Sequence, residues 1–165
     1  MTVGMLFALM FGFIVLIWVG YKVNALLQKK ISGYARVLDG DTILIGQHKI
    51  RLFGIDAPET NQFTQVGGQR YEVGKMASQF LREKIGQGPV SCRVMDRDRY
   101  GRYVAICKNA EGEDLGKLLV QAGMAVAYCR YTKAYRGDER KAKRRRTGLW
   151  AYGFQAPEQY RQQNC

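Results

Sequence analysis

Carboxylate and guanidinium side chains gather in four short stretches of this sequence. The stretches are Asp39-Gly-Asp-Thr42, Arg51, Asp56-Ala-Pro-Glu59 and Asp98-Arg-Tyr-Gly-Arg102. The single histidine, His48, lies in or beside a predicted hairpin turn, which argues against Ser-His-Asp hydrolysis, histidine metal sites and histidine nucleases. Any catalysis must therefore use carboxylates and arginines. Carboxylates and backbone carbonyls are hard oxygen ligands, which select Ca²⁺ or Mg²⁺.

Each stretch also has a purely structural interpretation. An Asp-Gly pair is usually a turn, and a proline after an aspartate usually ends a strand. Asp41 is expected roughly opposite Asp56 at the open end of a hairpin, which would place two carboxylates at one rim of a barrel. Arg51 and Asp56 are five residues apart, so a regular strand would point them to opposite faces of the sheet. Their convergence requires a bulge or a strong twist.

Short strands and helices must position these groups. Strands are predicted at 34–38, 42–45, 48–55, 90–95, 103–107 and 124–128, and helices at 73–85, 114–122 and 136–147. Residues 61–68 are polar and rich in glycine, which predicts a loop. The first five of these strands, with a helix between the third and the fourth, have the layout of an OB-fold, a small Greek-key barrel that often binds nucleic acid. We therefore expect an α+β domain, a five-stranded barrel with about three helices.

Residues 2–21 carry no charge and, as a helix, are long enough to cross the hydrocarbon core of a bilayer. Trp18 and Tyr21 at one end fit a membrane interface. We expect a retained single-pass anchor at 1–21, followed by a connector at 22–33. The alternative is a secretory signal that is cleaved near Val23-Asn24-Ala25, after which the protein would be secreted.

The charge of the chain is unusually positive. Twenty-six Lys and Arg against fourteen Asp and Glu give a net charge of +12, which indicates nucleic acid or an anionic lipid surface as partner, or serves solubility alone. The run Arg140–Arg146 on the third predicted helix has the same range of interpretations: it could follow a phosphate backbone, face an anionic bilayer, or be a solvated helix face.

The four cysteines lack C-x-x-C spacing, which argues against a zinc site. Cys92 and Cys107 fall on the two arms of a predicted hairpin. They could form a disulfide, which would require an oxidising compartment, or remain two buried thiols.

Three blocks of the sequence resemble the signature blocks of the staphylococcal nuclease (thermonuclease) family. The blocks are Val37-Leu-Asp-Gly-Asp-Thr-Ile43, Arg51-Leu-Phe-Gly-Ile-Asp-Ala-Pro-Glu-Thr60 and Asp98-Arg-Tyr-Gly-Arg-Tyr-Val104, and the match ends in Gly148-Leu-Trp150. The resemblance covers about residues 34–152 and leaves 153–165 as a tail without an assigned role. It implies a calcium-dependent endonuclease that hydrolyses DNA and RNA with little sequence specificity, with single strands preferred.

The resemblance also implies a role for individual residues. These are Asp41, Asp56 and the carbonyl of Ala57 as calcium ligands, Glu59 as general base, Arg51 and Arg102 as phosphate clamps, Asp39 as an acidic neighbour of the ligands, and Tyr100, Tyr128 and Tyr131 near the nucleotide. Bound Ca²⁺ would neutralise charge that develops on the phosphate, and two guanidiniums could each bind it through paired hydrogen bonds. The aromatic rings could stack on any base, although Tyr128 could equally pack within a strand.

Two other functions fit parts of this pattern. One is a catalytically inactive OB-fold that binds nucleic acid on a membrane anchor, and the other is an anchored envelope protein whose basic domain holds lipid headgroups. The presence of all the expected catalytic groups argues against the first, and the second leaves Glu59 unexplained. Lysines after the anchor would place the domain in the cytoplasm, whereas a free nuclease there would endanger its host. We therefore leave the side of the membrane open, with a slight preference for the extracytoplasmic side.

Overall fold

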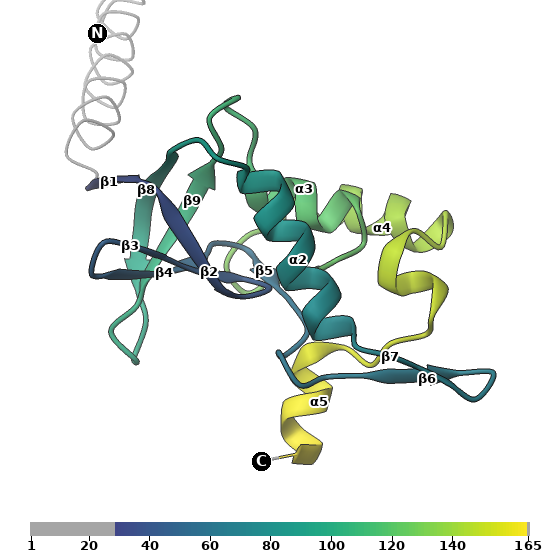
Figure 1. Ribbon diagram of the computed structural model, residues 1–165. Helices are drawn as coiled ribbons and strands as arrows, with labels where there is room; N and C mark the ends of the chain where they lie inside the picture. Colours follow the sequence, from purple (N-terminus) through teal and green to yellow (C-terminus); the bar gives the residue numbers. More distant parts are fainter. Residues whose placement is uncertain (1–28, 165) are drawn as a thin grey trace, which may run out of the picture.

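The computed structural model describes residues 29–164, in which a curled sheet is covered by helices (Figure 1). The sheet has the strand order β1-β8-β9-β4-β3-β2, and all neighbouring strands are antiparallel except the parallel pair β4 and β9. Its strands are β1 (Lys30–Gly33), β2 (Ala35–Asp39), β3 (Thr42–Ile45), β4 (His48–Leu52), β8 (Val90–Arg97) and β9 (Tyr103–Lys108). This curled half-barrel is consistent with the predicted OB-fold.

Short strand pairs and helices complete the domain. The pairs are β5 (Ile55–Asp56) with β10 (Val126–Ala127), and β6 (Thr64–Val66) with β7 (Gln69–Tyr71). The helices within residues 29–164 are α2 (Val73–Ile85), α3 (Leu115–Gln121), α4 (Arg136–Arg144) and α5 (Pro157–Asn164), with a 3₁₀ turn, η1 (Gly148–Ala151). No helix in this part of the chain is both long and apolar enough to span a bilayer, and the predicted anchor at 2–21 lies outside the described residues.

The core lies between the concave face of the sheet and the helices. Alternating residues of β3 and β4 point into it, among them Ile43, Ile50 and Leu52, and each is at most 1% exposed. Helix α2 presents Leu81 and Ile85 to the same cluster, and α3 contributes Leu115. Complete burial of one such side chain contributes about 1.5–3 kcal/mol, so this core can hold the strand ends that carry the polar groups in fixed positions.

Cys92 of β8 and Cys107 of β9 are directly opposite in the strand register, and both are buried. Their Cα atoms are 4.0 Å apart, and the two sulfurs are joined in a disulfide. The bond links neighbouring strands of the main sheet near the ends that lie away from the β8–β9 turn.

Several features differ from the sequence-based expectations. Residues 61–68 were predicted as a loop, but β6 and β7 form a hairpin that extends away from the domain in Figure 1. The tail contains a fourth helix, α5, which was not predicted because its polar sequence has no clear apolar face. Strand β1 lies within the predicted connector. Ile31 is its only buried residue, and one apolar position is too short a pattern to predict a strand from the sequence.

The predicted strand 48–55 is divided in two, and this division matters for the site. Gly54 has a φ of 77°, and a Cβ atom there would lie 2.5 Å from the Thr132 side chain. Only glycine fits both the left-handed backbone and the close approach. The chain therefore turns after Leu52 and begins β5 at Ile55, so that Asp56 can return to the side on which Arg51 lies.

Candidate active site

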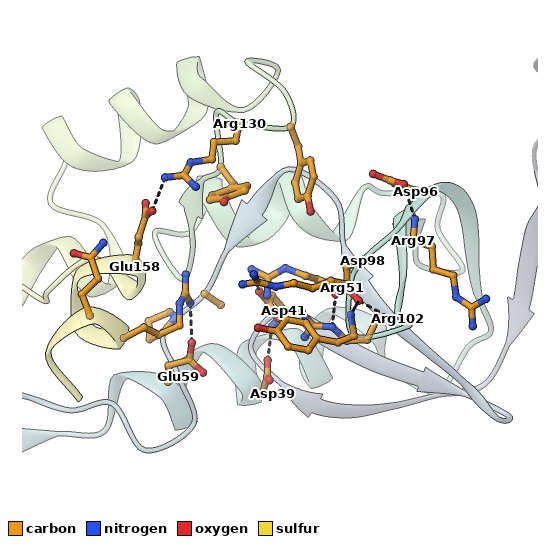
Figure 2. A pocket seen from close by; sticks show the side chains of 18 residues that line it. Asp39, Asp41, Arg51, Glu59, Asp96, Arg97, Asp98, Arg102, Arg130 and Glu158 are labelled. Atoms are coloured by element: carbon orange, nitrogen blue, oxygen red, sulfur yellow. Dashed lines mark hydrogen bonds and ion pairs between the residues drawn. The ribbon is translucent and has the colours of Figure 1, made fainter. Parts of the chain in front are cut away.

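A cleft of about 940 Å³ opens over the ends of several strands (Figure 2). Its walls come from the β2–β3 turn, β4, the segment after β5, the β8–β9 turn, residues 128–131 and α5. In the view of Figure 2, Glu59 and Arg102 lie on either side of Arg51 and Asp41. The cleft therefore brings together side chains that are far apart in the sequence.

Arg51 lies between two buried carboxylates at the base of the cleft. Its Nη2 atom is 2.9 Å from Asp41 Oδ2 and 2.6 Å from Asp56 Oδ1. Strand register explains the meeting, because Arg51 pairs with Thr42, the residue after Asp41, while the Leu52 amide donates to the Asp41 carbonyl. The structure brings these three side chains together, and the turn at Gly54 supplies the break in the strand that their meeting requires.

Burial raises the pKa of the Asp41 carboxyl to about 7, although the positive charge of Arg51 acts in the opposite direction. The Asp41 side chain also accepts a 2.8 Å hydrogen bond from the Thr42 hydroxyl, and Asp39 accepts one from the Asp41 amide. For Arg51, burial acts to lower the pKa, but the carboxylates of Asp41 and Asp56 outweigh it and raise the pKa. The positive charge of Arg51 therefore only partly offsets the effect of burial on the pKa of Asp41.

Arg161 of α5 is a member of the site that sequence analysis missed. Its guanidinium binds both oxygens of Asp56, at 2.8 and 3.2 Å, and its Nη1 lies 2.7 Å from Glu59 Oε1. These hydrogen bonds, that to Asp56 foremost, raise the pKa of Arg161 above its ordinary value. An arginine in a short polar segment looks like any surface arginine, so no local signal in the sequence identifies this contact.

Arg102 occupies the other side of the cleft at the end of the β8–β9 turn. Asp98 holds the turn by accepting hydrogen bonds from the amides of Tyr100 and Arg102 and from Arg102 Nε at 2.7 Å. Burial acts to raise the pKa of Asp98, but the bonds from Arg102 outweigh it and lower the pKa. This carboxylate fixes the orientation of Arg102, a role that the motif alone did not reveal.

The three tyrosines expected near a nucleotide all line the cleft. Tyr100 is 71% exposed and lies beside Arg102, with the guanidinium carbon 5.6 Å from the ring centre. Tyr128 and Tyr131 contact each other edge to face at 5.2 Å, and Tyr131 stacks on Phe53. Exposed rings at the rim can stack on bases without regard to sequence.

The donor chemistry at the base of the cleft fits a hard divalent cation. Within residues 29–164 no cluster of three or more His, Cys, Asp and Glu side chains has the geometry of a metal site. Asp41 Oδ2 and Asp56 Oδ1 nevertheless converge on one point, which Arg51 Nη2 holds, and Ala57 lines the cleft beside them. Two buried carboxylates and a backbone carbonyl are ligands of the kind that Ca²⁺ prefers.

Fold and cleft together define a small OB-type domain with a carboxylate and arginine site suited to a phosphate group. The chain belongs to the family of staphylococcal nuclease homologues, whose sequence model matches residues 49–152. The predicted family membership is confirmed. The matched range includes Arg51, Asp56, Glu59 and Arg102, whereas Arg161 lies beyond it.

Several curated proteins are similar to this chain. The succinoglycan biosynthesis protein ExoI of Rhizobium meliloti (strain 1021) is 36% identical over 123 residues, which cover 73% of this chain and 64% of ExoI. A micrococcal nuclease of Shigella flexneri is 32% identical over 132 residues, covering 70% of this chain and 71% of the relative. An uncharacterized endonuclease of Escherichia coli O157:H7 is 30% identical over 126 residues, covering 70% and 74% respectively. Relatives named as nucleases support a nuclease function.

Proposed function

We propose that this protein is a calcium-dependent endonuclease that hydrolyses phosphodiester bonds of DNA and RNA with little sequence specificity. The observation that carries the proposal is the meeting of Asp41, Arg51 and Asp56 at the base of an open cleft, with Glu59 at its side. Family membership and relatives named as nucleases support the same reaction class.

Each group in the cleft has a chemical task in this proposal. Ca²⁺ held by Asp41, Asp56 and the Ala57 carbonyl would offset the negative charge of the phosphate. Arg51 and Arg102 bind non-bridging phosphate oxygens, which a planar guanidinium does through paired hydrogen bonds. Glu59 removes a proton from the attacking water, and a positioned base typically contributes about 10²–10⁴-fold.

The substrate enters as a single strand, because an open cleft with tyrosines at its rim can receive unpaired bases. Stacking of each base is worth about 1–3 kcal/mol and tolerates every base type. Tyr100 is 71% exposed, so it is the most accessible of these three tyrosines to an incoming base. Asp39 supports the site indirectly by holding the backbone amide of Asp41 at 3.0 Å.

The test is cleavage of labelled single-stranded DNA and of RNA by the full-length protein, with Ca²⁺ and with EGTA. Glu59→Gln is measured beside Glu83→Gln, a matched change on the exposed face of α2, where Glu83 accepts a hydrogen bond from Gln79. We expect cleavage that requires Ca²⁺, collapses in Glu59→Gln and persists in Glu83→Gln. Tight binding without cleavage under any divalent ion would instead establish a nucleic-acid-binding module.

We also propose that residues 2–21 anchor the protein in a membrane with the domain on the extracytoplasmic side. The uncharged length of this segment supports the anchor, and the disulfide between Cys92 and Cys107 supports an oxidising compartment. Protease treatment of intact and of permeabilised cells tests the side. The protease must be able to reach the outer face of the membrane in the intact cells. If the domain is then protected from the protease, the proposed extracytoplasmic side is wrong. Recovery of a protein that lacks residues 2–21 would favour a cleaved signal over an anchor.

A further inference from the structure

Helix α5 places a cation on the carboxylates that the proposed reaction requires. Arg161 Nη2 and Nη1 bind the two oxygens of Asp56 at 2.8 and 3.2 Å, and Nη1 also binds Glu59 at 2.7 Å. The side chain of Asp56 is only 2% exposed, so its surroundings within the protein decide its partners. The family match ends at residue 152, so Arg161 lies in the segment that follows the matched range.

The segment that carries Arg161 is fixed to the domain at several points. Phe154 is buried against Val73 and Leu149, and the buried Gln62 donates a 2.7 Å hydrogen bond to the Gln155 carbonyl. A single exposed ion pair, Arg130 with Glu158, adds a contact from the opposite wall of the cleft. These contacts hold the segment before α5 and the first turn of the helix that carries Arg161.

The contacts of Arg161 conflict with the chemistry of an active site. Both oxygens of Asp56 carry a guanidinium hydrogen bond, and Asp56 Oδ1 is also bonded to Arg51. A divalent cation needs lone pairs on such an oxygen, and it is repelled by an adjacent positive charge. Glu59 Oε1 likewise accepts a hydrogen bond from the Arg161 guanidinium, so an oxygen that the proposed base would use is already engaged.

We propose that Arg161 is an internal counter-ion that competes with a divalent cation for Asp56 and thereby sets the cation concentration at which the site becomes active. The inference rests on the proposed function for the identity of the cation. When the cation binds Asp56, the Arg161 side chain, which is 35% exposed, swings toward solvent and releases Glu59. Arg161 is thus a positioning residue that acts through Asp56 and Glu59.

The test compares cation binding by full-length wild-type protein, Arg161→Gln and Arg130→Gln. Binding is read from the rise in Tm as Ca²⁺ is titrated, which requires no catalysis. Arg130→Gln removes an arginine from the same cleft and a contact to the same helix, but Arg130 does not touch Asp56. Near-ultraviolet circular dichroism establishes that each variant is folded.

We expect Arg161→Gln to lower the half-saturating Ca²⁺ concentration by on the order of tenfold, the scale at which partners of metal ligands act. Its Tm without Ca²⁺ should fall below that of the wild type, because Asp56 then has Arg51 as its remaining cationic partner among the described contacts. Arg130→Gln should bind Ca²⁺ as the wild type does. An unchanged or higher half-saturating concentration in Arg161→Gln overturns the inference, and so does an equal decrease in Arg130→Gln, which would reflect net charge alone.

The readout separates this inference from the proposed function. If Arg161→Gln binds Ca²⁺ more tightly but neither protein cleaves nucleic acid, the competition stands and the nuclease proposal falls. If the wild type cleaves and the two affinities are equal, the nuclease proposal stands and the competition falls. A wild-type protein that shows no Ca²⁺-dependent rise in Tm contradicts the inference.

Discussion

At the scale of single residues, the two arginines proposed to bind phosphate are held in different ways. Arg51 bridges two buried carboxylates, whereas Arg102 is held by Asp98 through its Nε atom at 2.7 Å. Asp98 binds Arg102 through Nε, and Arg102 lines the cleft. The two Nη atoms of Arg102 are therefore not used by this contact. The two residues are therefore expected to respond differently to substitution.

Arg102→Lys should reduce kcat/KM by about 10²–10³-fold, the range found when one donor to a developing charge is lost. Lysine keeps the positive charge but has no Nε donor for Asp98 and no planar pair of donors for phosphate. Steady-state cleavage of single-stranded DNA at saturating Ca²⁺ measures the effect. Arg82→Lys, on the exposed end of α2, is the control and should be silent. A rate for Arg102→Lys within a few fold of wild type would remove Arg102 from the mechanism.

Asp98 gives a prediction for the pH dependence of stability. Hydrogen bonds from Arg102 lower the pKa of Asp98 below 3.8, so the folded state favours the charged form. The stabilisation is fully present above this unfolded-state pKa and is lost as the pH falls through the folded pKa. Asp98→Asn should therefore cost about 1–2 kcal/mol at pH 7, and the difference from wild type should shrink below pH 4. Urea unfolding at both pH values tests this, and a gap that stays constant or widens in acid would contradict it.

At the scale of elements, the local sequence pattern predicts an element correctly where that element has a regular apolar face. It fails where a single contact with a distant residue determines the structure. Helix α2 is predicted and observed at Val73–Ile85, because its apolar spacing extends over the whole helix. The break between β4 and β5 depends on the crowding of Gly54 by Thr132, which is 78 positions away in sequence and invisible to any local window. Arg161 was missed for the same reason, since its partner Asp56 is 105 residues distant.

The disulfide gives a prediction about β8 and β9. Its two cysteines are separated by 15 residues, and closing a loop of that size stabilises a fold by about 3 kcal/mol in the chain-entropy account. Replacing both Cys92 and Cys107 with Ala should lower the free energy of unfolding by about this amount, plus a smaller loss of buried surface. Guanidinium unfolding of the variant and of wild type with and without reductant tests this. A wild type insensitive to reductant and equal to the double variant would show that the bond does not stabilise the fold.

At the scale of the whole molecule, the positive charge is concentrated on one helix. Between Arg136 and Arg146 the exposed cations are Arg136, Arg140, Lys141, Lys143, Arg144, Arg145 and Arg146, while Ala142 is the buried residue of α4. The segment immediately before α4 lines the cleft with Tyr128, Arg130 and Tyr131. A polynucleotide that leaves the cleft along this segment therefore meets a basic helix, whose Lys and Arg side chains can displace the counterions of its phosphates.

Replacing Arg140, Lys141, Arg144 and Arg145 with Gln should weaken binding of long single-stranded DNA and make it less sensitive to salt. For single strands the slope of log K against log salt changes by about 0.7 per phosphate contact, so loss of four contacts reduces its magnitude by about 3. Fluorescence anisotropy with a long oligonucleotide in EGTA, at several KCl concentrations, measures the slope. Cleavage of an oligonucleotide that only fills the cleft should be unaffected.

The matched control removes four exposed cations elsewhere, with Lys49, Lys75, Arg82 and Lys117 replaced by Gln. Both variants lose the same net charge, so a general field effect changes both slopes alike. A larger change in the α4 variant locates the strand on α4. Equal slopes in the two variants would mean that the α4 cations form a solvated helix face. If the α4 variant binds DNA normally but no longer binds vesicles of anionic lipid, the helix binds a membrane surface. Loss of vesicle binding alone depends on the charge of the lipid headgroups and not on the nucleic acid.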